Sequence, residues 1–187
     1  YTPIPIDVTE NYTIDADKIH NVHAVIAVDI FGNMSNWTKL KELDIPVIND
    51  AAQSLESHNG SMWSASCGDI SCISFSPSKT VSSWGSGGAL LTNDLETANF
   101  AKKLRLHGKQ NNSTPSINPG MNSMLSSFEA ACVWAGLDRI DVWRKRRQDI
   151  SSEIISQSKY YCALDSIPIH TLHKLVFQSE NRDSVIT

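Results

Sequence analysis

The chain has 187 residues, of which 41% are hydrophobic and 19% charged, and its formal net charge is -4. This composition is typical of a globular protein, and the weak negative charge gives no reason to expect nucleic acid or an anionic membrane as a partner. No apolar run approaches the roughly 20 residues of a membrane span, so we expect a soluble, cytoplasmic protein.

The first third of the chain alternates short apolar runs with polar segments. Continuous or alternating apolar residues predict strands at Pro3–Val8, His23–Ile30 and Ile45–Ile48, the second of them buried on both faces. A short helical turn is predicted at Asp15–Asp17. A helix is predicted over Ser35–Leu43 with Ser35 as its N-cap.

Strands and helices continue to alternate through the rest of the chain. We expect strands at Ile70–Phe75, Ala89–Thr92 and His170–Phe177, and a loop at 109–119. Helices are predicted over Leu95–Leu106, Ser127–Leu137 and Asp138–Leu164, the last with the basic run Arg144–Arg147 on a solvated face. This order predicts an α/β domain with a mostly parallel sheet, in which ligands gather at the carboxyl ends of strands.

The four cysteines are Cys67, Cys72, Cys132 and Cys162. They form no C-x-x-C pair and lie in or beside apolar segments, which favours free thiols over a metal site or disulfides.

Lys79 has an unusual position for a lysine. It follows the apolar run Ile70–Phe75 and a Ser-Pro turn, and it precedes a cluster of glycines at positions 85, 87 and 88. Most lysines lie on solvated helix faces. A lysine between two strands can instead lose part of its hydration, and its amine then becomes available as a nucleophile toward an aldehyde.

A lysine that binds an aldehyde cofactor needs partners, and the sequence offers three. Asp50 follows a predicted strand, where a carboxylate can pair with a protonated ring nitrogen; alone, it would be interpreted as a turn or capping residue. Gln53 can donate to a ring oxygen, although alone it is an ordinary polar residue. Ser74 can bind phosphate oxygens.

Several ordered segments together resemble the DegT/StrS family of sugar aminotransferases, which are pyridoxal-phosphate enzymes of fold type I. The resemblance covers nearly the whole chain. It is carried by Val47-Ile-Asn-Asp-Ala-Ala-Gln53, Gly68-Asp-Ile-Ser-Cys-Ile-Ser-Phe-Ser-Pro-Ser-Lys79, Gly85-Ser-Gly-Gly-Ala-Leu-Leu-Thr-Asn-Asp94, Leu104-Arg-Leu-His-Gly108, Gly120-Met-Asn122 and Glu129-Ala-Ala131.

The resemblance implies a role for each candidate residue. Lys79 forms the internal aldimine with pyridoxal phosphate and moves a proton between substrate and cofactor. Asp50 pairs with the pyridine nitrogen, Gln53 contacts the ring oxygen and Ser74 contacts the phosphate. Asn122 matches an asparagine that reaches the cofactor of a neighbouring subunit, so a homodimer with shared active sites is implied.

The resemblance also implies the substrates and the domain plan. The amino donor is typically glutamate, and the acceptor is a keto group on a nucleotide-linked sugar, in nucleotide-sugar and polysaccharide biosynthesis. Residues 1–137 match the large cofactor-binding domain without its first part. Residues 138–187 match a linking helix and the start of a small α+β C-terminal domain, so we expect a chain truncated at both ends.

Two positions depart from the family pattern, and one alternative to an aminotransferase remains open. Met124 stands where an arginine is common, and Ser86 where an acidic residue is usual. With the expected truncation, these departures leave a non-catalytic remnant of the fold as the alternative. Lysine at position 79 favours an aminotransferase over the family's dehydratases, which typically carry histidine there. A dinucleotide-binding protein is disfavoured because no G-x-G-x-x-G follows the first strand.

Overall fold

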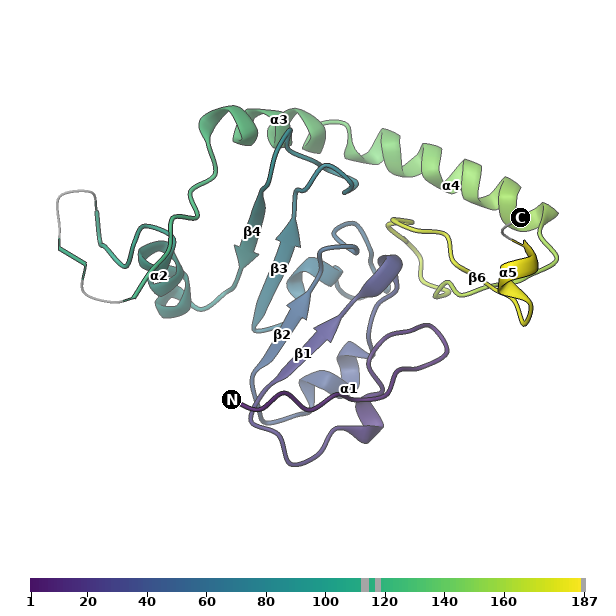
Figure 1. The fold of residues 1–187 in the computed structure, drawn as a ribbon, viewed down its shortest axis with the longest axis horizontal. Coiled ribbons are helices and arrows are strands. Elements are labelled where there is room, and N and C mark those ends of the chain that lie inside the picture. The colour runs from purple at the N-terminus through teal and green to yellow at the C-terminus, as the bar shows by residue number, and fades with distance from the viewer. Residues whose placement is uncertain (112–114, 117–118, 186–187) are drawn as a thin grey trace.

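A computed structural model describes residues 1–111, 115–116 and 119–185, and the predicted loop at 109–119 lies partly outside them. Four strands form one sheet in the order β1 (Val25–Val28), β2 (Val47–Asp50), β3 (Ile70–Ser74) and β4 (Gly88–Leu91) (Figure 1). β1, β2 and β3 are parallel, whereas β4 is antiparallel to β3. The predicted α/β fold with a mostly parallel sheet is therefore confirmed. The carboxyl ends of the three parallel strands share one edge.

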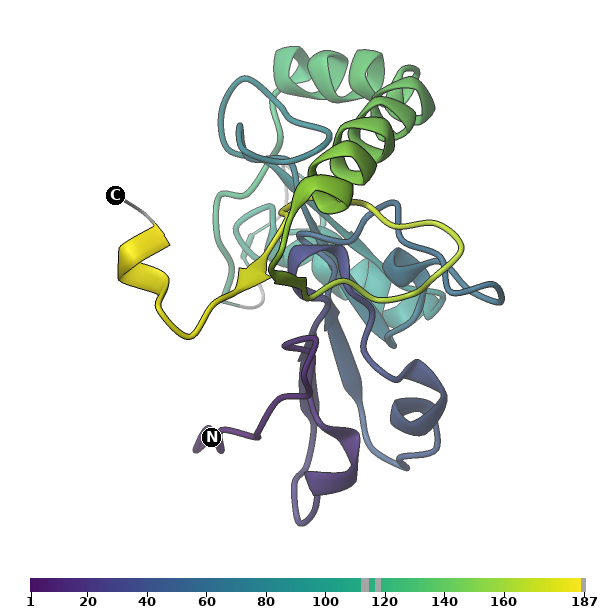
Figure 2. The same ribbon diagram turned by 90° about the vertical axis from the view of Figure 1, so that its right-hand side faces the viewer.

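The other elements connect the strands or flank the sheet in the sequence. Helices are α1 (Trp37–Lys41), α2 (Leu95–Leu104), α3 (Ser127–Leu137), α4 (Ile140–Gln157) and α5 (Arg182–Val185), with 3₁₀ turns at Ala16–Lys18, Ile30–Gly32 and Ser64–Ser66. A small antiparallel pair joins β5 (Tyr161–Cys162) to β6 (Phe177–Gln178). Figures 1 and 2 show α3 and α4 following one another along one side of the molecule. None of these described helices is long and apolar enough to cross a membrane.

Two clusters of buried side chains hold the elements together. The first packs α1 against β1 and β2, and its largest fully buried side chains are Trp37 and Leu40. The second joins β3 and the segment after it to α3, through Ile73, Phe75, Val81 and Val133. Gly136 permits this approach, because a Cβ there would lie 3.2 Å from Val81. Burial of aliphatic and aromatic side chains contributes about 1.5–3 kcal/mol each, so these clusters fix the sheet and α3 relative to each other.

The prediction of a strand at Pro3–Val8 was wrong. Only an isolated bridge between Val8 and Ile14 forms there, because prolines 3 and 5 have no N–H for a ladder. The helix predicted over Ser35–Leu43 is shorter, and Asn36 rather than Ser35 caps it by accepting from the Lys39 N–H at 3.2 Å. The Ser35 N–H instead donates to Asp29.

The strand predicted at His23–Ile30 forms as β1 but is not buried on both faces. Val25 and Ala27 are buried, whereas Ile26 is 64% exposed. β4 is also mostly exposed, with Leu90 44% and Leu91 42% exposed. One face of the sheet is therefore largely uncovered by the described residues.

The C-terminal elements differ most from the prediction. α4 ends at Gln157 instead of continuing to Leu164, because Ser158 is extended and residues 161–162 pair with β6. The strand predicted at His170–Phe177 is reduced to β6. Leu172 has a φ of 53°, which is incompatible with a strand, and the Leu172 N–H donates to the preceding His170 ring.

Candidate active site

The predicted site residues Asp50, Gln53 and Ser74 lie where parallel strands end. Asp50 is the last residue of β2 and is paired in register with Cys72 of β3, while Ser74 is the last residue of β3. Gln53 follows three residues after Asp50. The sheet topology therefore brings these three residues to the same edge, as expected for a ligand site of an open α/β sheet.

Asp50 and Ser74 each retain hydrogen-bonding capacity toward a ligand. Asp50 Oδ1 accepts from the Ala52 N–H at 3.1 Å, which leaves Oδ2 without a hydrogen bond from the described residues. Ser74 Oγ accepts from the Ser76 N–H at 3.3 Å, so the hydroxyl proton can be donated to an anion. Burial of Cys72 raises the pKa of its thiol, and the charge of Asp50 raises this pKa further.

The orientation of Gln53 is fixed by the backbone of a neighbouring segment. Its Oε1 accepts from the Phe31 N–H at 2.9 Å. Phe31 lies in the 3₁₀ turn Ile30–Gly32 after β1 and has a φ of 64°. Because the oxygen is engaged, the Nε2 amide is left as a donor, which is the group needed to bind a ring oxygen.

Lys79 lies in the connection between β3 and β4, on a loop closed at its base. The Phe75 N–H donates to Gly87 O at 2.8 Å, and the Ser83 N–H donates to Phe75 O at 2.7 Å. Within the loop, the Lys79 N–H closes a turn on Ser76 O at 2.9 Å. Lys79 is partly buried, and among the described residues its ammonium forms no salt bridge. Its ammonium therefore has no carboxylate partner among the described residues.

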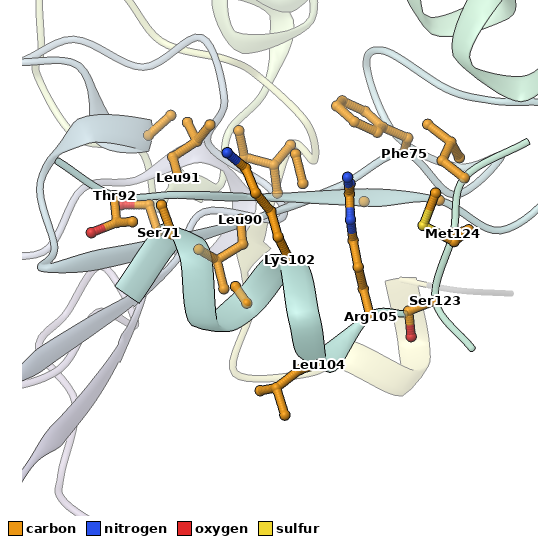
Figure 3. Close-up of a pocket in the computed structure, with 18 of the residues that line it drawn as sticks. Ser71, Phe75, Leu90, Leu91, Thr92, Lys102, Leu104, Arg105, Ser123 and Met124 are labelled. Atoms are coloured by element: carbon orange, nitrogen blue, oxygen red, sulfur yellow. The ribbon is translucent and has the colours of Figure 1, made fainter. Parts of the chain in front are cut away.

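Asn122 lies apart from these four residues, in the lining of the main hollow. It forms an isolated bridge with Leu106 after α2. The hollow, of about 1260 Å³, lies between β3–β4, α2 and residues 121–125. In Figure 3 the Lys102 and Arg105 side chains extend from α2 toward the strand layer. Ser86 and Met124, the two departures from the family pattern, line the same hollow.

Sequence reasoning missed the interactions of three titratable residues: Glu56, Arg147 and His173. Arg147 pairs with the buried Glu56, so the prediction of a solvated face for the whole basic run was wrong at this position. Burial lowers the His173 pKa to about 4, and the charge of Lys79 contributes, so His173 is neutral at pH 7. No local sequence pattern predicts these contacts, because the partners are distant in sequence.

Sequence and structure comparisons identify the family of the chain. The profile of the DegT/DnrJ/EryC1/StrS aminotransferase family matches residues 1–180. The chain belongs to this family. A structure of a DegT/DnrJ/EryC1/StrS aminotransferase from Brucella abortus superposes with a TM-score of 0.88 at 23% identity, over 98% of this chain and 54% of that one. The family's fold type I architecture is therefore present.

The curated members of the DegT/DnrJ/EryC1/StrS family that resemble this chain include two sugar aminotransferases. The dTDP-3-amino-3,4,6-trideoxy-alpha-D-glucose transaminase of Micromonospora megalomicea is 28% identical over 82% of this chain and 44% of its own length. The UDP-2-acetamido-2-deoxy-3-oxo-D-glucuronate aminotransferase of Pseudomonas aeruginosa is 27% identical over 98% of this chain and 55% of its own length. The chain thus spans about half the length of these relatives.

The observed donors and acceptors fit pyridoxal phosphate, the cofactor of this aminotransferase family. Asp50 has a carboxylate oxygen without a hydrogen bond from the described residues, Gln53 has an amide donor left over, and Ser74 has a hydroxyl that can donate. The Lys79 ammonium forms no salt bridge among the described residues. When bound, the cofactor supplies an electron sink for a carbanion. The residues of this chain would hold its ring and phosphate, and the Lys79 amine would accept and return a proton.

Proposed function

We propose that this chain is the cofactor-binding core of a pyridoxal-phosphate-dependent aminotransferase that moves an amino group to a keto nucleotide-sugar. Glutamate is the proposed donor. The observation that carries this proposal is that Lys79 lies on the closed loop that follows β3, while Asp50 and Ser74 end the neighbouring strands β2 and β3. The substrates of the relatives, a dTDP-linked and a UDP-linked sugar, support the acceptor class.

Four residues have proposed roles around the cofactor. Asp50 would keep the pyridine nitrogen protonated, Gln53 would donate to the ring oxygen, and Ser74 would donate to the phosphate. Lys79 would bind the cofactor covalently and act as the proton carrier. These roles agree with the hydrogen-bonding capacity that each side chain retains.

The assembly and cellular context are also proposals. We infer a cytoplasmic homodimer in which Asn122 reaches the cofactor of the neighbouring subunit. The placement of Asn122 in the hollow, away from the strand-end edge, supports a role outside its own subunit's site. We also propose that residues 1–137 belong to the large domain and 138–187 to the link and the small domain.

The proposed function is tested by an absorbance spectrum of the purified protein with added pyridoxal phosphate. Wild type should gain a visible band that free cofactor does not reproduce, and borohydride should fix the cofactor on Lys79, as located by peptide mapping. Lys79→Ala should show neither effect. Lys39→Ala is the matched control, because Lys39 lies on the distant α1 and is half exposed. Absence of the band in wild type would favour the non-catalytic remnant.

A further inference from the structure

A buried carboxylate closes the loop that carries Phe31. Asp29 directly follows β1 and is fully buried. Its Oδ1 accepts from the Ser35 N–H at 2.7 Å, so one side chain joins the two ends of the loop formed by residues 30–34. The Asp29 N–H also donates to Asp50 O at 3.1 Å, which attaches the start of this loop to the end of β2. The backbone around Phe31 is therefore held at both of its ends.

Two buried serines connect the same carboxylate to the segment that contains Gln53. Ser64 Oγ donates to Asp29 Oδ2 at 2.5 Å, and Ser54 Oγ lies 2.6 Å from Ser64 Oγ. A serine hydroxyl has a single proton. Because Ser64 gives its proton to Asp29, Ser54 is the donor in the second contact. Ser54 is the neighbour of Gln53 in sequence, so the backbone of Gln53 is tied to the buried carboxylate.

These contacts form a closed ring of interactions that includes Gln53. The Gln53 side chain accepts from the Phe31 N–H at 2.9 Å, while its backbone continues into Ser54, whose hydroxyl is linked through Ser64 to Asp29. The chain from Asp29 to Phe31 completes the ring. Buried polar groups are costly to leave without a partner, so the inner part of this ring has one strongly favoured geometry. Gln53 itself is only partly buried, and its orientation depends on the ring.

The segment after β2 holds the same loop at a further point. Ser57 Oγ donates to Gly32 O at 2.6 Å. Gly32 follows Phe31 and has a φ of 108°, a conformation that favours glycine. The loop and the segment are thus in contact at two successive positions of the loop, and one of these contacts is the hydrogen bond to Gln53.

We propose that Asp29, Ser64 and Ser54 are positioning residues for Gln53. They act through buried hydrogen bonds that fix the Phe31 N–H and the Gln53 backbone relative to each other. The Gln53 oxygen then stays engaged, and the Nε2 amide stays directed toward the cofactor. The inference rests on the proposed role of Gln53 as the donor to the ring oxygen. It adds that this donor is aimed by side chains that do not contact the cofactor.

The test measures hydrogen exchange of the Phe31 N–H by NMR in the protein without cofactor. The Asp69 N–H, which is bonded to β2, serves as the reference amide. Ser54→Ala removes one hydroxyl and leaves all three donors to the Asp29 carboxylate in place. We expect Ser54→Ala to raise the exchange rate of Phe31 relative to that of Asp69 about fivefold, which corresponds to the loss of one hydrogen bond.

A double variant shows whether the serine acts through the glutamine. Gln53→Met removes the acceptor of the Phe31 N–H and should raise its exchange rate. Adding Ser54→Ala to Gln53→Met should raise the rate no further, because the contact that the serine supports is already absent. Ser71→Ala is the matched control: Ser71 is also a buried serine, but its hydroxyl forms no hydrogen bond with the described residues. It should leave the exchange ratio unchanged.

The loaded protein gives a second readout, which a purely structural role would not change. A hydrogen bond to the ring oxygen stabilises negative charge there, so it influences the pH at which the visible band forms. Gln53→Met should shift this midpoint, and Ser54→Ala should shift it in the same direction by a smaller amount. Ser71→Ala should leave the midpoint at the wild-type pH. Thermal unfolding of each variant, measured in parallel, separates these shifts from a loss of stability.

The outcomes separate this inference from the proposed function. An exchange ratio for Ser54→Ala that matches wild type, or an effect of Ser54→Ala that persists beside Gln53→Met, would overturn the positioning role. A midpoint that moves in Gln53→Met but not in Ser54→Ala would also overturn it. If wild type forms no visible band with pyridoxal phosphate, the proposed function fails, while the exchange ratios still decide whether the buried hydrogen bonds hold Gln53.

Discussion

Trp37→Phe tests the buried contact that joins α1 to the sheet. Trp37 is 1% exposed, and its Nε1 donates to the Asp29 carboxylate at 3.0 Å to Oδ2 and 3.3 Å to Oδ1. Phenylalanine removes this donor and leaves part of the indole volume empty. A hydrogen bond to a charged group contributes about 1.5–3 kcal/mol, and the void adds about 1–2 kcal/mol. The free energy of unfolding should therefore fall by about 3–5 kcal/mol.

The assay is urea unfolding followed by far-ultraviolet circular dichroism, since tryptophan fluorescence itself changes with the substitution. Trp84→Phe is the matched control because Trp84 is 81% exposed. It should change the free energy of unfolding by no more than about 0.5 kcal/mol. Equal losses in the two variants would refute the assignment of Trp37 to the core.

The Trp37 effect should also depend on pH. Burial raises the Asp29 pKa in the folded protein, and hydrogen bonds from Ser64, Ser35 and Trp37 oppose this rise. Because the folded pKa is above the unfolded one, the stability linked to this carboxyl is greatest at low pH and is lost as the pH rises through the folded value. Trp37→Phe raises that pKa further. Its penalty should therefore be largest at neutral pH and shrink in acid, and a penalty that grows in acid would contradict this reasoning.

Two further predictions concern a buried histidine and a buried thiol. His170 Nδ1 accepts from the Leu172 N–H at 2.9 Å, Nε2 lies 2.9 Å from Asn33 Oδ1, and burial lowers the pKa from 6.5 to about 4. Stability should fall by at most about 3 kcal/mol as the pH drops through this window, as measured by urea unfolding, and His170→Gln should abolish that part of the loss. Burial, with the charge of Asp29, raises the Cys67 pKa to about 12, so a thiol-reactive disulfide reagent at mildly alkaline pH should modify Cys67 only after unfolding.

Local patterns were sufficient to predict most of the sheet. β2 and β3 formed near the predicted residues, where short apolar runs lie between turn signals. Asp50 ends β2, as its position after a predicted strand indicated. The capping box that starts α3 at Ser126 is likewise a local signal, and α3 has the predicted bounds.

Features that depend on distant partners could not be predicted. The helical pattern of α4 continues past Gln157, but pairing of residues 161–162 with 177–178 ends it. Similarly, an apolar run in the sequence does not show whether another element packs over the strand. The exposure of Ile26 on β1 was therefore not predicted. Glu56 and Arg147 lie 91 positions apart, and neither has a local context that distinguishes it from a surface residue.

These failures have a common physical origin in the way the candidate site is held. Asp50 ends a strand, but Gln53 and Lys79 lie on turns with few regular backbone hydrogen bonds, so their positions depend on side-chain and loop contacts. Gln53 is fixed by the Phe31 N–H, and the base of the Lys79 loop is closed through Phe75. The first anchor comes from another part of the chain, whereas the second is local. Strand-end positions therefore indicate which residues are candidates for the site, and tertiary contacts such as that between Gln53 and Phe31 hold them.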